Sequence, residues 1–133
     1  MENITQELRT SLETIPYSNM LGFRLIELRE GYSKVSVKSL PEHSNYHGWT
    51  DGSLVMSLAD YASVCASNSL GRKRVAVQIN INFLAGAAIN SELIAEARAI
   101  HAGRTTVIIE MTVTDSTGKI IARASSTIVN YDG

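Results

Sequence analysis

Apolar and polar residues alternate with a period of two over much of the chain, which is typical of β-strands that bury one face. In the segment 75–83 every odd position is apolar, and the segment 107–113 repeats this pattern. The segment 93–99 has alanine at most of its apolar positions, so its small side chains leave room for a bulky element above the sheet. The pattern predicts strands at 21–29, 32–39, 75–83, 91–101, 105–114 and 119–130.

Residues 52–70 show a different pattern, because they are apolar or small on nearly every side and are bounded by glycines. A helix of this composition packs inside a protein, since serine and alanine let other backbone approach closely. Its polar residues, five serines among them, argue against a membrane span. A shorter amphipathic helix near the N-terminus is predicted from the helical spacing of Ile4, Leu8, Leu12 and Ile15.

Short connections join the predicted strands. Glu30-Gly31, Ala102-Gly103-Arg104 and the segment 115–118 have the composition of hairpin turns, so the strands they join should pair antiparallel. The order is helix, two strands, buried helix, four strands. This order predicts an α+β fold in which an antiparallel sheet of five to six strands wraps around one long central helix.

Asp60 is the only charged residue between Gly52 and Gly71. Moving an ionised carboxylate out of water costs several kcal/mol unless it is paired, hydrogen-bonded or put to use. Asp60 is therefore a candidate functional residue, and a purely structural role in a hydrated gap or an ion pair is the alternative. Cys65 lies on the same helix without a basic neighbour, which favours packing over nucleophilic chemistry.

The composition limits the classes of function. At 133 residues we expect one domain over 1–133. The net charge of −1 gives no footprint for nucleic acid and no polybasic patch for a membrane surface. The single cysteine excludes an internal disulfide framework and suits a reducing compartment. The acidic start of the chain is not a secretory signal, so we expect a cytoplasmic protein.

One segment carries a resemblance to a known family. Asn45-Tyr46-His47-Gly48-Trp49-Thr50-Asp51-Gly52-Ser53, followed by Leu58-Ala59-Asp60, resembles the hotdog-fold thioesterases of the phenylacetic-acid-degradation (PaaI-like) type. There an Asn precedes a His-Gly-Gly triplet, and Leu-Ala-Asp follows nine residues after the His. Further similar segments, in the same order, are 81–84, 93–97, 101–105 and 118–123.

The resemblance covers roughly residues 18–130 and implies the hotdog fold and hydrolysis of acyl-CoA without a cofactor. The amides of Gly52 and Ser53 would polarise the thioester carbonyl, Asn45 would hold substrate or water, and Asp60 would be general base or nucleophile. Gly52 and Asp60 lie about 12 Å apart along one helix, at about 1.5 Å per residue. Asp60 must therefore come from a neighbouring copy of the chain, as the family also implies.

Other residues have two interpretations. Ser63 and Ser67 follow Asp60 on one side of the helix and either contact the substrate or merely pack. Arg104 and the segment 72–74 either contact CoA phosphates or form solvated turns. The substrate-binding residues that we predict are Asp51, Ser53, Ser63, Ser67, Asn82 and Arg104. His43 and His47 lie in a loop without a carboxylate or cysteine at ligand spacing, so we predict no metal site.

The chain departs from the family at one point, because His-Gly-Gly is replaced by Asp51-Gly52-Ser53. Asp51 suits a helix N-cap, but its charge would weaken the binding of a developing oxyanion. The leading hypothesis is an acyl-CoA thioesterase, and the alternative is a catalytically weak hotdog domain that binds acyl-CoA or a related ligand. A hotdog dehydratase is a more distant third, since it needs a suitably placed His. We expect a homodimer or a dimer of dimers.

Overall fold

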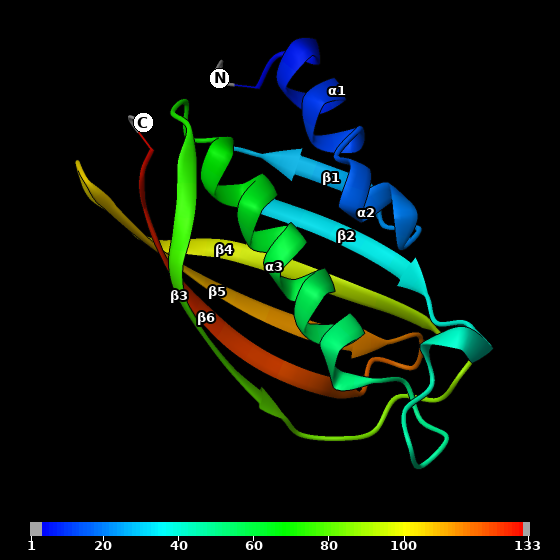
Figure 1. Ribbon diagram of the computed structural model, residues 1–133. Helices are drawn as coiled ribbons and strands as arrows, with labels where there is room; N and C mark the ends of the chain where they lie inside the picture. The colour runs from blue at the N-terminus through cyan, green and yellow to red at the C-terminus, as the bar shows by residue number, and fades with distance from the viewer. Residues whose placement is uncertain (1–3, 132–133) are drawn as a thin grey trace.

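The computed structural model describes residues 4–131, and within this range it contains three α-helices, one 3₁₀ helix and six strands (Figure 1). The helices are α1 (Gln6–Glu13), α2 (Pro16–Met20), η1 (Pro41–His43) and α3 (Gly52–Asn68). The strands are β1 (Arg24–Arg29), β2 (Tyr32–Lys38), β3 (Arg74–Phe83), β4 (Glu92–Ala102), β5 (Thr106–Asp115) and β6 (Ile120–Asn130). All six predicted strands and the predicted buried helix are present.

The strands form one antiparallel sheet in the order β1-β2-β4-β5-β6-β3. The sheet curves around α3, which lies along its concave face, and α1 and α2 lie beside α3 on the side of β1 (Figure 1). This arrangement confirms the predicted α+β hotdog fold with a short N-terminal helix. Within the described range, none of the helices is long and apolar enough to cross a membrane.

Small residues allow α3 to lie close to the sheet. Ala62 of α3 and Ala95 and Ala97 of β4 are completely buried. The Ser33 hydroxyl of β2 donates a hydrogen bond to the Ala62 carbonyl oxygen at 2.6 Å, which ties the helix to the sheet. The prediction that the small side chains of 93–99 accommodate the helix is confirmed, since α3 packs on β4 where these alanines are completely buried.

Pro16 divides the predicted N-terminal helix in two. The apolar spacing predicted one helix that included Ile15, but α1 ends at Glu13 and α2 begins at Pro16. Ile15 has an extended backbone with ψ of 120°, because the proline ring sterically disfavours the helical region for the residue before it. α2 then turns toward the first turn of α3, and the Tyr17 hydroxyl lies 3.5 Å from the Ser57 hydroxyl.

β3 is an edge strand whose outer side has no neighbouring strand among the described residues. A register shift between Ala76 and Gln78 interrupts its alternation. Val75 and Val77 are therefore 46% and 62% exposed, whereas Ile79 packs against the core. The prediction that all odd positions of 75–83 share one face is wrong at the start of the strand, because a bulge shifts the side-chain alternation.

Leu58 tests the core, because it lies on the sheet-facing side of α3 and is completely buried. We expect Leu58→Ala to lower the free energy of unfolding by about 2–5 kcal/mol, through lost burial and the cavity left behind. The matched control is Leu84→Ala at a leucine that is 58% exposed, for which we expect a smaller loss of about 1 kcal/mol or less. Urea unfolding measures both, and equal losses would contradict the assignment of Leu58 to the core.

Candidate active site

The first turn of α3 leaves one backbone donor free. Asp51 is the N-cap, and its Oδ1 accepts hydrogen bonds from the Ser53 amide at 2.8 Å and the Ser53 hydroxyl at 2.7 Å. These bonds lower the pKa of the Asp51 carboxyl. Among residues 4–131, nothing accepts a hydrogen bond from the Gly52 amide. The cap therefore occupies the Ser53 amide and leaves that of Gly52 available for a ligand.

Asn45 supplies a second donor beside this turn. Its Oδ1 accepts hydrogen bonds from the amides of His47 at 2.9 Å and Trp49 at 3.1 Å, which hold the loop that leads into α3. Because only the oxygen of an amide group can accept, these bonds set the orientation of the side chain. The Nδ2 group points away from the loop amides and makes no hydrogen bond within the described residues.

Gly52 and Asn45 line one cavity of about 410 Å³, a size typical of ligand pockets. Carbons of the Phe83 ring lie 3.2 Å from the position that a Cβ on Gly52 would take. A Cβ at this position would press on that ring, so glycine leaves the ring room to lie against the helix. The remaining walls are mostly apolar and come from Trp49, Thr50, Val55, Leu84, Ala85, Gly86, Ala87 and Ile121.

Asp60 lies two turns farther along α3 and is half-buried. Burial raises the pKa of its carboxyl, and no hydrogen bond or ion pair to it is found across residues 4–131. An unpaired carboxylate that is partly removed from water is a better base than an exposed one. Asp60 is about 12 Å from Gly52 along the helix axis, so one chain does not bring them to the same atom.

Ser63 and Ser67 lie on the same side of α3 as Asp60, three and seven residues farther on, and both are buried. The Ser67 hydroxyl donates to the Val64 carbonyl at 3.2 Å, as packing serines in helices do. The Ser63 hydroxyl has no partner among the described residues. Packing therefore explains Ser67, while the unpaired Ser63 hydroxyl needs another explanation.

The structure separates Asn82 from the other candidates. Asn82 pairs with Arg123 of β6 and lines a groove on the outer face of the sheet together with Asn80 and Glu110. Its neighbour Phe83 faces α3, and successive residues of a strand point to opposite faces. Asn82 is thus outside the cavity of Gly52 in its own chain.

Arg104 lies at the opposite end of the sheet from Gly52. Its carbonyl accepts a hydrogen bond from Asn130, which pairs with Arg74, and the Arg74 amide donates to Asn68 at the end of α3. Arg104 is exposed, while the Nε and Nη1 atoms of Arg74 are buried and have no partner in the described part of the chain. Basic groups therefore gather where α3 ends, but a full helix length from Gly52.

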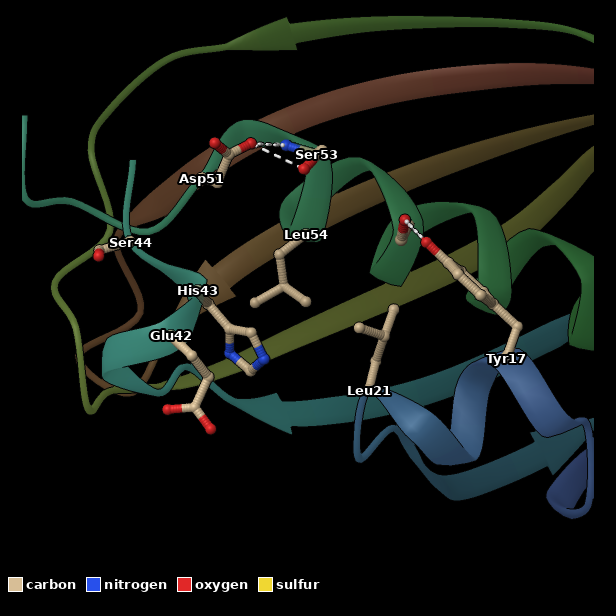
Figure 2. A pocket seen from close by; sticks show the side chains of 9 residues that line it. Tyr17, Leu21, Glu42, His43, Ser44, Asp51, Ser53 and Leu54 are labelled. Carbon is tan, nitrogen blue, oxygen red and sulfur yellow. Dashed lines mark hydrogen bonds between the residues drawn. The ribbon is translucent and has the colours of Figure 1, made fainter. Parts of the chain in front are cut away.

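A second cavity, of about 250 Å³, lies on the other side of the first turn of α3 (Figure 2). It is lined by Tyr17, Leu21, Glu42, His43, Ser44, Asp51, Ser53, Leu54 and Ser57. His43 points into this space in Figure 2, and its Nδ1 accepts the Leu40 amide at 2.9 Å. The sequence pattern gave no sign of this cavity, because η1 and α2 were not predicted.

Two cavities thus flank the start of α3, and Asp51 belongs to the one without Gly52 and Asn45. The sequence also gave Phe83 no role in a site, because its packing on Gly52 joins positions far apart in the chain. Cys65 is buried and its pKa is raised to about 12, mainly by burial, so its predicted packing role is confirmed.

The chain is similar in sequence to known proteins. The model of the thioesterase superfamily matches residues 47–122. A putative esterase of Archaeoglobus fulgidus is 36% identical over 115 residues, which cover 85% of this chain and 75% of that protein. The acyl-coenzyme A thioesterase PaaI of Escherichia coli is 28% identical, over 88% of this chain and 84% of that one.

The fold of this chain is also similar to those of solved structures. The structure of E. coli PaaI superimposes with a TM-score of 0.92 at 26% identity, and the match covers 96% of this chain and 93% of that chain. A Streptococcus mutans protein solved with bound acetyl CoA has a TM-score of 0.80 at 28% identity, over 83% and 89% of the two chains.

The N-cap generates a pH prediction. Hydrogen bonds lower the pKa of Asp51 in the folded protein below 3.8, so its contribution to stability is complete above that value and is lost as the pH falls through the folded pKa. Asp51→Asn keeps an acceptor but does not titrate. We expect the Tm of the wild type relative to Asp51→Asn to be constant above about pH 5 and to fall below it. A Glu42→Gln variant controls for loss of charge, and a Tm difference independent of pH would contradict the cap.

Proposed function

Because the chain belongs to the thioesterase superfamily, we propose that it hydrolyses acyl-CoA thioesters to a free acid and CoA at a site shared by two copies. One observation carries the proposal. The free Gly52 amide and the Asn45 amide group border one cavity, while the half-buried Asp60 carboxylate lies too far along the same helix to reach it. A site with both donors and the carboxylate needs a second chain.

In this mechanism the thioester carbonyl oxygen accepts hydrogen bonds from the Gly52 amide and from Nδ2 of Asn45. Both donors stabilise the negative charge that develops on the oxygen, helped by the positive end of the helix dipole. Asp60 of the second copy takes a proton from water while the water oxygen adds to the carbonyl carbon. The C–S bond then breaks, and the CoA thiolate that leaves takes the proton back from the Asp60 carboxyl, which regenerates the carboxylate. Direct attack by the carboxylate is the alternative route.

The free edge of β3 supports the second copy. Val75 and Val77 expose apolar surface there, and an unpaired edge is a template for pairing with another strand. Two copies paired antiparallel about a two-fold axis would lay the end of one β3 beside the start of the other. In that arrangement the second copy would bring Asp60, and with it Ser63, toward the cavity of Gly52.

The same pairing gives the basic residues a role. The start of β3 in one copy would lie near the end of β3 in the other, which places Arg74 and the nearby Arg104 toward the mouth of the cavity of the second copy. Guanidinium groups suit CoA phosphates. The S. mutans protein solved with acetyl CoA supports this choice of ligand. Asn82 has no part in this site, because it lies on the outer face.

One observation favours the second candidate, a weakly catalytic domain that binds acyl-CoA. Asp51 occupies the Ser53 amide, so this turn offers the carbonyl oxygen one backbone donor rather than two. Each oxyanion donor contributes about 10²- to 10³-fold to kcat where it has been removed. The Nδ2 group of Asn45 offsets this loss in our proposal, and the Asp51 carboxylate faces the other cavity.

Mixing two inactive variants tests the shared site. Asp60→Asn removes the base, and Asn45→Asp removes the donor but keeps the oxygen that holds the loop. We expect each variant alone to lose about a hundredfold or more in thiol release. In mixed dimers one site combines the intact Asn45 of one chain with the intact Asp60 of the other. Random exchange of subunits should restore about a quarter of the wild-type activity.

Each outcome of the mixing experiment has one meaning. A site within one chain leaves every mixed dimer inactive, so absence of recovery after confirmed subunit exchange would refute the shared site. Mixing Asp60→Asn with a second batch of the same variant is the control. Wild-type turnover by Asp60→Asn would refute the role of this carboxylate, and no thiol release from any ester by the wild type would favour the binding domain.

Asp51→His tests whether the cap limits activity. The change removes a negative charge beside the helix N-terminus and frees the Ser53 amide as a further donor. We therefore expect kcat/KM for the best acyl-CoA ester to rise, with some loss of thermal stability from the weaker cap. Steady-state kinetics of the wild type and of Asp51→His measure this change in kcat/KM. A drop of about tenfold or more would mean that Asp51 takes part in the chemistry.

A further inference from the structure

Two aromatic rings in the cavity of Gly52 each rest on a glycine. Phe83 ring carbons lie 3.2 Å from where a Cβ of Gly52 would be, and Trp49 ring carbons lie 3.2 Å from where a Cβ of Gly86 would be. About half of each side chain stays exposed toward solvent. Each ring therefore touches backbone on one side and leaves its other surface available to a ligand.

Hydrogen bonds hold the backbone that carries the Phe83 ring. Phe83 is the last residue of β3 and pairs with Ala122. The next two amides, of Leu84 and Ala85, both donate to the Ile121 carbonyl, at 2.8 and 3.2 Å. The ring already touches Gly52, so it has no room to move closer to the helix. Phe83 is thus a wall of the cavity that cannot recede toward the helix beside the free Gly52 amide.

The cavity suits an apolar group. Apart from Asn45 and Thr50, its walls are aromatic, aliphatic or glycine residues, and Val55 and Ile121 are buried beneath them. CoA is polar and anionic, so of the two halves of a thioester the acyl half fits these walls better. A carbonyl held at the Gly52 amide would then direct its acyl chain along the ring of Phe83.

We propose that Phe83 sets the upper size limit of the acyl group, with Trp49 as a second wall of the cavity. This proposal rests on the proposed function. Because Gly52 blocks movement of the ring toward the helix, a longer acyl chain that runs along the cavity meets the ring itself, so the limit on chain length is steric. A single methylene in such a pocket changes kcat/KM by about 10- to 200-fold.

The test uses straight-chain esters from acetyl-CoA to dodecanoyl-CoA and measures kcat/KM for each. We expect Phe83→Ala to raise the ratio of the longest to the best short ester by about tenfold or more, and Phe83→Leu to have a smaller effect. The control is Tyr131→Ala, an exposed aromatic residue outside the cavity, for which we expect no change. The ratio does not depend on the fraction of folded enzyme, so partial unfolding cannot imitate the result.

The failure of this inference is distinguishable from the failure of the proposed function. If the wild type releases thiol but Phe83→Ala leaves the ratio unchanged, the role of Phe83 is wrong and the thioesterase assignment stands. If the wild type hydrolyses none of the esters, the proposed function fails, and calorimetric affinities for the same esters then test the size limit. Equal affinity ratios in the wild type and Phe83→Ala would overturn it.

Discussion

The close approach of α3 to the sheet is the constraint on which the rest of the structure depends. Alanine and serine on both surfaces remove the bulk that would otherwise hold a helix about 10 Å from a sheet, and Ser33 adds a hydrogen bond to the helix backbone. The contact sets the position of α3 along the sheet and its rotation about its own axis. The positions of the Gly52 amide and of the Asp60 side chain both follow from that, because both residues belong to α3.

Neighbouring residues at the start of α3 have separate roles. Asp51 accepts the hydrogen bond of the Ser53 amide and lines one cavity, while Gly52, whose amide has no acceptor among the described residues, lines the other. The cap therefore takes one backbone donor of this turn and leaves the Gly52 amide to a ligand. The sequence suggested that Asp51 competes with a ligand for the donors of this turn, because residues 51 to 53 adjoin in the chain, and the structure limits this competition to the Ser53 amide.

Local patterns predicted the elements well, and contacts between distant residues account for the differences. Alternation and turn composition were sufficient for all six strands, and the smallness of residues 93–99 indicated where the helix would lie. The break at Pro16 was readable from its missing amide. The bulge after Ala76 was not, because it depends on pairing with β6. The same limit applies to the site, since the outward face of Asn82 follows from register and the contact of Phe83 with Gly52 from tertiary packing.

The burial of Cys65 has a practical consequence. It is the only cysteine of the chain, it is completely enclosed, and its thiol has a pKa raised to about 12. Colorimetric reagents act on exposed thiolate, so the folded protein contributes almost no background when they report free CoA. A rise in colour that precedes substrate addition would instead signal unfolding. The same inertness makes the chain a natural single-label scaffold, in which a cysteine introduced at the surface would be the sole reactive position.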